Sequence, residues 1–415
     1  MYMMTFYALP ASYTWGNALT ATGIRWNLVA AFIFACAVVL DSRRTTIGHR
    51  LDIHRIVIAA IGLFSINAAF VHLLAADNPE RSAANLELLW KRFGLLVVMV
   101  AALKDRKDFK ILFMTILIGG MYVGYEAIFN NVGSDHDGRL WLKIGGTAGN
   151  HVTPILCLSL PIGAYFLVHG KWKEKGVALL SIVLTGETVL RCISRASFVG
   201  VLIAAGWFVI RSKGKHRILA IVGVLVGLPV AFVQMEEGGL ERFMTTFAAS
   251  GERDGSAQSR VDFLKAGIEM FKDHPFGTGG ESCFESDLGA TYIRHLGREA
   301  MIVRDGGYRS VHNGFITIAA GWGIQGFLLL SSAVVVSWRR LHAVQQLSHD
   351  PQMQDPVLAS VALECMIVIL LTCSMFNSDY GGEAYYWWMA MVLGIDKVAS
   401  QQPSMAIQQP GTELA

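Results

Sequence analysis

Three residues have the types and positions needed to bind a phosphorylated ligand. Arg195 and Arg260 each follow a serine, and His312 precedes Asn313. Each of the three is expected near the start of a helix, where unpaired backbone N–H groups and the positive end of the helix dipole attract anions. Arginine adds a planar fork that fits phosphate oxygens. The set predicts an anion site with an imidazole beside it.

Each residue also has an ordinary structural interpretation. Arginines near a membrane surface can extend toward lipid headgroups, and an interfacial histidine can cap a helix. Spacing alone leaves both alternatives open for Arg195, Arg260 and His312. The occurrence of all three at comparable places is what favours the functional interpretation.

Other ionisable residues are weaker candidates. Asp135 and Asp137 flank His136 in a pattern that a divalent metal could use, but nearby glycines favour a solvated turn. Lys91 and Arg92 are expected about 12 residues, or roughly 18 Å, from the cytoplasmic end of their span. Ionisable residues at that depth are usually functional unless they extend to the surface. Motifs for zinc or nucleotide binding are not visible, so no metal and no cofactor is expected.

The elements that position these residues must be membrane helices. Hydrophobic residues make up 53% of the 415 residues and charged residues only 16%, against about 25% charged in a typical soluble protein. Uncharged runs of about 20 residues match the thickness of a bilayer, and only helices or closed barrels satisfy their backbone in lipid. We expect an all-α, polytopic membrane protein that forms one domain over residues 1–415. A nucleic-acid binder, a disulfide scaffold and a disordered chain are excluded.

The number of transmembrane helices is expected to be about twelve. The weakest is the first, because Pro10, Gly16 and several hydroxyl groups dilute its apolar character, so eleven is the alternative. Glu187 and Glu364 fall inside spans and are expected to be buried, hydrogen-bonded structural carboxylates. The expected spans cover residues 4–22, 26–40, 56–76, 88–103, 111–130, 152–169, 176–190, 197–210, 218–234, 313–337, 357–376 and 384–396.

Lys and Arg in the short loops predict the orientation. One alternating set carries two to four of these residues per loop: 41–55, 104–110, 170–175, 211–217 and 338–355. The other set carries none to two per loop: 77–87, 131–150, 191–196 and 377–383. The first set is therefore expected in the cytoplasm, together with the C-terminus. The N-terminal stretch lacks the basic segment of a cleavable signal peptide.

This orientation places one large loop, residues 236–311, on the outer side. Ser259 is expected to cap a short amphipathic helix with Arg260 in its first turn, and the Pro275 region should end it. Cys192 and Cys283 also fall on this side, where either a disulfide or two isolated thiols would be compatible with an oxidising compartment.

The motifs, in this order, resemble those of the O-antigen ligase and polymerase superfamily of bacterial inner-membrane glycosyltransferases. They are Ser194-Arg195-Ala196-Ser197, then Ser259-Arg260 opening a segment that ends in His274-Pro275-Phe276-Gly277, then His312-Asn313. The resemblance covers about residues 145–330. This sequence differs from the family pattern at two places. The family's usual Ser-Arg-Gly reads Ser-Arg-Ala here, and its Asn-Pro-Asn-like segment appears as Gly149-Asn150-His151.

The resemblance implies a function for the site. Arg195 and Arg260 would hold a polyprenyl pyrophosphate, and His312 would act as general base in glycan transfer without a metal. The expected donor is a glycan on undecaprenyl pyrophosphate, and the expected acceptor is a sugar hydroxyl of the lipid A core at the periplasmic face of the inner membrane. Arg309, Asn313, Lys91 and Arg92 are secondary candidates for the site.

Three alternatives to ligation stay open. Two belong to the same superfamily: polymerisation of lipid-linked glycans, and transfer to a protein hydroxyl. The third is transport of a lipid-linked oligosaccharide. Transporters usually carry internal repeats and polar groups near the midplane, whereas this sequence shows no duplication and its marked residues are expected at one face.

Overall fold

The chain is mostly helical, as predicted. The computed structural model describes residues 2–40, 52–135, 139–145, 147–212, 214–234, 255–280, 286–294, 303–304, 307–308, 310–347 and 353–401. Besides helices, this part contains three antiparallel ladders of two residues per strand: β1 (Ser134–Asp135) with β2 (Leu140–Trp141), β3 (Lys143–Ile144) with β4 (Thr147–Ala148), and β5 (Val303–Arg304) with β6 (Gly307–Tyr308).

Helices occupy every expected span after the first. They are α3 (Trp26–Leu40), α4 (Asp52–Ala75), α5 (Pro79–Ala102), α6 (Arg106–Phe129), α7 (Val152–Cys157) with α8 (Ser159–His169), α9 (Trp172–Arg191), α10 (Arg195–Arg211), α11 (Gly214–Gln234), α15 (Gly314–Gln346), α16 (Gln354–Ser374) and α17 (Glu383–Gln401). Five segments among the described residues are long and apolar enough to cross a membrane: Arg55–Ala75, Arg106–Phe129, Val152–His169, Gly314–Gln346 and Gln354–Ser374. The total number of crossings stays a prediction.

The first expected span is not a single helix. It consists of α1 (Tyr2–Tyr7), two 3₁₀ turns (η1, Pro10–Ser12; η2, Thr14–Gly16) and α2 (Asn17–Thr20). The prediction of a transmembrane helix over residues 4–22 is therefore wrong, for the reason that weakened it: a proline cannot continue a helix that precedes it. The segment nevertheless packs into the bundle, because Tyr7 is fully buried and the Tyr2 hydroxyl donates to Glu383 at 2.9 Å.

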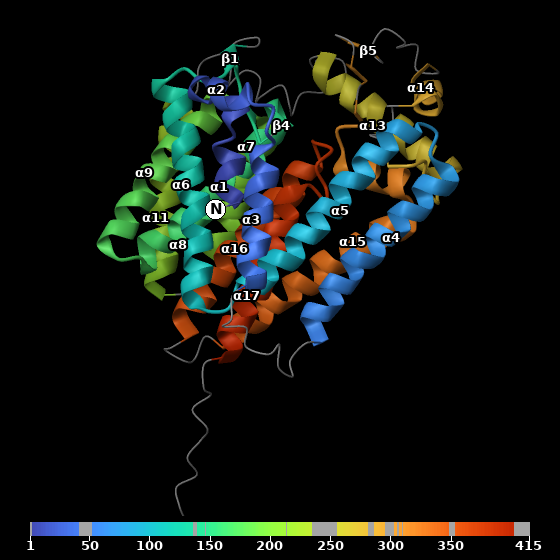
Figure 1. Cartoon of the computed structure of the whole chain (residues 1–415). Coiled ribbons are helices and arrows are strands. Elements are labelled where there is room, and N and C mark those ends of the chain that lie inside the picture. Colours follow the sequence, from blue (N-terminus) through green and yellow to red (C-terminus); the bar gives the residue numbers. More distant parts are fainter. Residues whose placement is uncertain are drawn as a thin grey trace, which may run out of the picture.

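The helices form a bundle in which α16 and α17 lie between two groups. On one side are α6, α8, α9 and α11, and on the other are α4, α5 and α15 (Figure 1). The central helix α16 is buried along almost its whole length. At one end of the bundle lie β1, β4, α13, α14 and β5 (Figure 1). The loops 131–150 and 236–311, both expected on the outer side, thus have their described parts at the same end, which we call the outer end.

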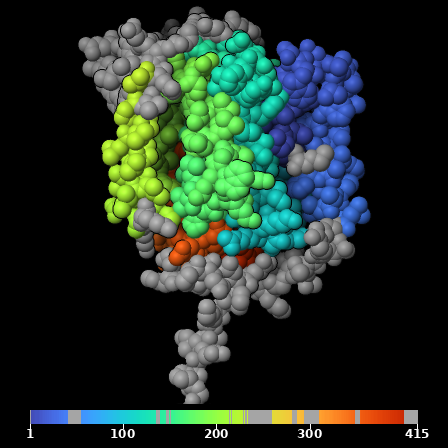
Figure 2. Space-filling view, turned by 90° about the vertical axis from the view of Figure 1, so that its left-hand side faces the viewer, coloured from blue at the N-terminus to red at the C-terminus, as the bar shows by residue number. Residues whose placement is uncertain are grey.

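The flanks of the bundle are apolar, as a lipid-facing surface should be. Figure 2 shows the face formed by α6, α9 and α11, in teal, green and yellow-green. These helices carry exposed large apolar side chains, including Leu179, Val183, Leu225 and Val226. An exposed apolar area of this extent is typical of a surface that water does not contact. It supports the placement of these helices in a bilayer.

The two glutamates expected inside spans differ in their surroundings. Glu364 in α16 is fully buried and accepts hydrogen bonds from Trp207 and Arg211 of α10, both at 3.0 Å. This confirms the expected structural role of Glu364. Glu187 is hydrogen-bonded to Arg191 at 2.8 Å but its side chain is only partly covered, so the expectation that it is buried is wrong. The carboxylate stays near the helix end, where its partner reaches it.

The long loop contributes a helix that begins earlier than predicted. Helix α13 spans Gly255–Asp273, followed by α14 (Asp287–Arg294). Ser259 is therefore not the N-cap, and Arg260 lies in the second turn rather than the first. The residues before Ser259 are compatible with a helix, and a serine inside a helix does not by itself start one. The predicted end before Pro275 is confirmed.

Helix α15 is broken in the middle by Gly323. This residue has φ 78°, which L side chains rarely adopt. The N–H groups of residues 278–280 donate to the carbonyls of Ala320 and Gly321, and Ile324 N–H donates to Pro275 carbonyl. The segment 275–280 thus docks into the break and satisfies the backbone groups that the kink releases. Gly326, one turn after the kink, lies against α4, where a Cβ would meet Asn67 and Phe64.

Candidate active site at the outer end

Arg195 is the first residue of α10, as predicted. Ser194 is the N-cap, and its Oγ accepts a hydrogen bond from the Ser197 N–H at 3.4 Å. The Ser197 hydroxyl donates in turn to Thr153 of α7 at 2.9 Å. These buried hydroxyl groups fix the start of α10 against the start of α7. The guanidinium group is thereby attached to a rigid part of the bundle.

His312 lies one residue before the N-cap of α15. Asn313 is the cap, and its Oδ1 accepts from the Ile316 N–H at 3.1 Å. The His312 Nδ1 is 3.5 Å from the Ser310 hydroxyl, and the residue is partly exposed. The predicted position at the start of this helix is therefore correct. The imidazole projects from the chain just before the helix rather than from its first turn.

The backbone before both helices is in the left-handed region. Ile193 has φ 46° and His312 has φ 54°, and Asn131 is the third non-glycine residue of this kind in the described part of the chain. A β-branched residue such as Ile193 is a clear outlier there. Such conformations cost about 1–3 kcal/mol each and cluster at functional sites. Two of these three strained residues thus belong to the candidate site: Ile193 lies two positions before Arg195, and the other is His312 itself.

Arg260 reaches the same end of the bundle through the packing of α13 on α15. Phe263, one turn after Arg260, is buried in a cluster with Val311, which precedes His312. Gly267, two turns after Arg260, allows close approach, since a Cβ there would lie 2.9 Å from Ile316. Helix α13 therefore places Arg260 in the neighbourhood of His312. Because Arg260 lies in the second turn of α13, the free N–H groups of the helix start are not next to it and do not add to anion binding there, contrary to the expectation.

One turn joins the elements that carry Arg195 and His312. It comprises residues 375–382, between α16 and α17, and we call it the outer turn. The Cys373 thiol, at the end of α16, donates to the carbonyl of Ala196 at 3.5 Å. On the other side, the Asn313 amide donates to the Met375 carbonyl at 3.3 Å. The start of α10 therefore contacts the end of α16, and the start of α15 contacts the outer turn that directly follows it, although α10 and α15 are far apart in the sequence.

The secondary candidates have different surroundings. Lys91 forms an exposed ion pair with Glu87, one turn earlier on α5. Arg92 is partly buried, and its Nη1 donates to the Gly381 carbonyl of the outer turn at 3.4 Å. Asn313 acts as a helix cap. Arg309 lies outside the described residues. Of the two residues within α5, only Arg92 thus contacts the region of the candidate site.

The sequence did not reveal a histidine–carboxylate pair in this region. His151 Nδ1 lies 2.6 Å from Asp379 Oδ2 of the outer turn, although 228 positions separate the two residues. Burial lowers the pKa of His151, but the hydrogen bond and the charge of Asp379 raise it by more, so the pKa lies above its usual value. The only sequence signal was a histidine within a segment where the family has Asn-Pro-Asn.

The remaining candidates of the outer loops, the Asp135–Asp137 segment and the two cysteines, lie partly outside the described residues. Asp135 pairs with Leu140 in a β-hairpin, which agrees with the solvated turn, while residues 136–138 lie outside the described part. No group of three metal-binding side chains is found among the described residues. Cys192 is a buried free thiol, and Cys283 lies outside the described residues.

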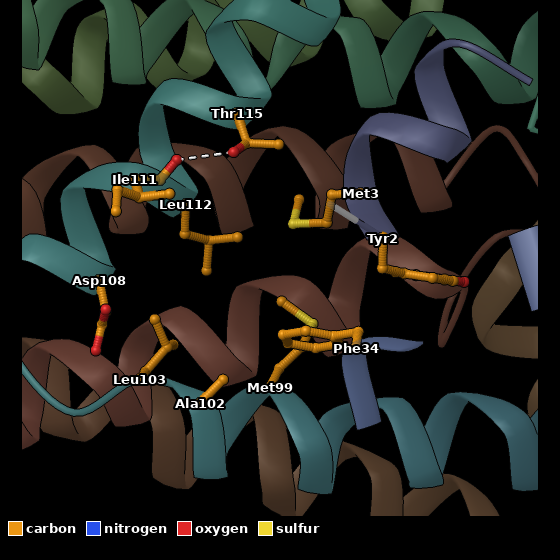
Figure 3. A pocket seen from close by; sticks show the side chains of 10 residues that line it. All are labelled: Tyr2, Met3, Phe34, Met99, Ala102, Leu103, Asp108, Ile111, Leu112 and Thr115. Atoms are coloured by element: carbon orange, nitrogen blue, oxygen red, sulfur yellow. Dashed lines mark hydrogen bonds between the residues drawn. The ribbon is translucent and has the colours of Figure 1, made fainter. Parts of the chain in front are cut away.

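A cavity elsewhere in the bundle contains none of these residues. Figure 3 shows it between α1, α3, α5 and α6, where mostly apolar side chains such as Met3, Phe34, Met99 and Leu112 line it. Asp108 and Thr115 add two polar groups, and the Asp108 carboxylate already accepts from the backbone N–H of Lys104 at 3.1 Å. The cavity therefore has no evident part in the chemistry of the outer end.

The long apolar helices and the polar outer end define a multi-pass membrane protein with a candidate site at one end of its bundle. Residues 179–331 match the family model described as O-antigen ligase. The match contains Arg195, Arg260, His312 and Asn313, and it confirms the resemblance to the O-antigen ligase superfamily. No curated protein matches the chain. The family supports a ligase or polymerase activity of the glycosyltransferase kind.

Proposed function

We propose that the protein is an O-antigen ligase. It transfers a glycan from undecaprenyl pyrophosphate to a sugar hydroxyl of the lipid A core, on the periplasmic face of the bacterial inner membrane. The observation that supports this most is that the starts of α10 and α15 contact the end of α16 and the adjoining outer turn, with Arg195 and His312 at those starts. Both residues lie in the segment that matches the family.

Arg195 and Arg260 bind the donor pyrophosphate in this proposal. A pyrophosphate diester carries about two negative charges, which two guanidinium groups offset, each through a planar fork. Further charge develops on the phosphate oxygen as the bond to the sugar breaks. Fixed cations stabilise that charge without reorganising. The energy of the reaction comes from the activated donor, so a nucleotide is not needed.

His312 is the general base for the acceptor. Its neutral imidazole takes the proton of the sugar hydroxyl, the acceptor oxygen forms a bond to the anomeric carbon, and undecaprenyl pyrophosphate leaves with the electron pair. Asn313 holds the backbone of His312 through its cap and its bond to Met375.

An in vitro transfer assay tests the proposal directly. Purified protein in nanodiscs is given a glycan on undecaprenyl pyrophosphate together with either lipid A core or a second lipid-linked glycan. Products on the lipid A core support ligation. Lengthening of the lipid-linked glycan alone would identify a polymerase. If no glycosidic bond forms with either acceptor, the proposal is wrong, and movement of the lipid-linked glycan across the membrane of sealed proteoliposomes would identify a transporter.

The reaction is expected to continue in the presence of a chelator. The two arginines supply the positive charge that Mg²⁺ or Mn²⁺ provides in metal-dependent glycosyltransferases. The measurement is the transfer rate with and without EDTA, with Asp135→Ala and Asp137→Ala variants as companions. Loss of activity in EDTA that a divalent ion restores, or loss in either variant, would contradict the metal-free mechanism.

A further inference from the structure

The His151–Asp379 pair lies between the two helix starts that carry the proposed site residues. His151 directly precedes α7, whose Thr153 hydroxyl accepts from Ser197 beside Arg195. Asp379 belongs to the outer turn, whose Met375 carbonyl accepts from Asn313 beside His312. The next residue of the turn, Tyr380, packs so closely on Gly314 that a side chain there would collide with it. Contacts of α7 with α10 and of the outer turn with α15 therefore hold His151 and Asp379 in place.

The ring of His151 has one nitrogen engaged and one available. Nδ1 is 2.6 Å from the Asp379 carboxylate, so Nδ1 carries the proton and donates it. Within the described part of the chain, Nε2 has no hydrogen-bond partner. The side chains of His151 and Asp379 are 35% and 38% exposed, so a ligand at the outer end can reach the ring.

The contact with Asp379 favours the protonated form of the ring. Besides Asp379, the elements next to His151 carry further charges: Arg139 and Lys143 in the preceding hairpins, Glu187 and Arg191 at the end of α9, and Arg195 at the start of α10, and both α9 and α10 contact α7. Of these, Asp379 is hydrogen-bonded to the ring, and Glu187 and Arg191 pair with each other at 2.8 Å. A protonated ring donates through both nitrogens, one to Asp379 and the other to an anion.

We propose that His151, held by Asp379, is a third donor-binding residue, which gives its Nε2–H hydrogen bond to a phosphate oxygen of the polyprenyl pyrophosphate. This inference rests on the proposed function, because it assigns the same ligand as Arg195 and Arg260. No bond is made or broken at His151. It binds the donor as an imidazolium, and the affinity for donor therefore falls as the pH rises through the titration of the ring.

The test measures binding of undecaprenyl pyrophosphate to the full-length protein in nanodiscs across pH 5.5–8.5, which needs no turnover. We expect His151→Gln to weaken binding about 10-fold at the acidic end, as the loss of a charge-assisted hydrogen bond does. The wild-type dissociation constant should rise with pH more steeply than that of His151→Gln. The ligand's own titration is common to both proteins and cancels in the comparison.

Two further variants complete the experiment. Asp379→Asn keeps a hydrogen-bond partner but removes the charge, so the pH transition should move to lower pH. His72→Gln is the matched control, since His72 is bonded to Ser82 at 2.8 Å and has no part in the site. Thermal unfolding of each variant shows whether it is folded.

The outcomes separate this inference from the function on which it rests. If Arg260→Ala loses affinity while folded His151→Gln matches the wild type in affinity and pH profile, the inference is wrong and the proposed function stands. If Arg260→Ala also binds as the wild type does, the proposed pyrophosphate site itself is wrong. A loss that is equal in His151→Gln and His72→Gln would likewise overturn the role of His151.

Discussion

Arg195 combines a fixed backbone with a charge at the start of a helix. Arg195→Ala should reduce the transfer rate by about 10²–10³, the cost of removing one group that stabilises developing charge. Arg195→Lys should recover part of the rate, because lysine supplies a charge without the planar fork. The measurement is kcat and donor KM in nanodiscs. Arg191→Ala is the control, since Arg191 ends the preceding helix α9 and pairs with Glu187. A normal rate for Arg195→Ala would remove Arg195 from the mechanism.

Substitutions of His312 and Arg260 should affect different steps of the reaction. His312→Ala is expected to bind donor normally but to turn it over about 10²–10⁴ times more slowly, the usual contribution of proton transfer. Arg260→Ala should lose donor affinity as well, because it removes charge from the pyrophosphate site. Donor binding and single-turnover rates are compared in the same nanodiscs. A His312→Ala protein that binds poorly but turns over bound donor at the normal rate would make the histidine a binding residue.

At the residue scale, the sequence was informative where the signal is local. Arg195 and His312 were each expected near the start of a helix, and both helix starts are present, with Ser194 and Asn313 as their caps. Ser259 gave the same local signal, yet α13 begins at Gly255, because nothing in the preceding residues stops the helix. The His151–Asp379 contact joins residues 228 positions apart, and no periodicity or cap in one sequence reports such a pairing.

At the scale of elements, the break in α15 couples the long loop to the bundle. Gly323→Ala should destabilise the protein by about 1–3 kcal/mol, since alanine is strained at φ 78° and its Cβ would also collide with the Phe276 carbonyl. The release of segment 275–280 should also lower the transfer rate, because that segment continues from α13, which carries Arg260. Thermal unfolding and transfer rates are the measurements.

Gly206→Ala is the matched control for this substitution. Gly206 lies inside α10, and an alanine Cβ there would meet no neighbouring side chain or helix within 4 Å among the described residues. Alanine should therefore be neutral or stabilising at this position. Equal thermal unfolding midpoints for Gly323→Ala and the wild type would show that the kink does not depend on glycine. The hydropathy pattern predicted helix α15 but not its kink, because an apolar run looks the same whether its backbone is straight or broken.

At the scale of the whole molecule, apolar runs and loop charges carried most of the information. Helices lie at every expected span after the first, because only helices satisfy a backbone in lipid. The first segment was harder to predict, since its apolar residues are buried by protein contacts such as those of Tyr7 rather than by lipid. Composition alone does not distinguish these two kinds of burial.

The distribution of Lys and Arg over the loops predicts which end of the bundle faces the periplasm. Lys143, in a loop expected outside, and Lys173, in a loop expected inside, are both exposed. In a cysteine-free background, Lys143→Cys should react with an impermeant maleimide on intact spheroplasts, and Lys173→Cys should react only after permeabilisation. The physical reason is that basic loops are retained on the cytoplasmic side during insertion. The reverse labelling pattern would place Arg195 and His312 in the cytoplasm, where a periplasmic ligation could not use them.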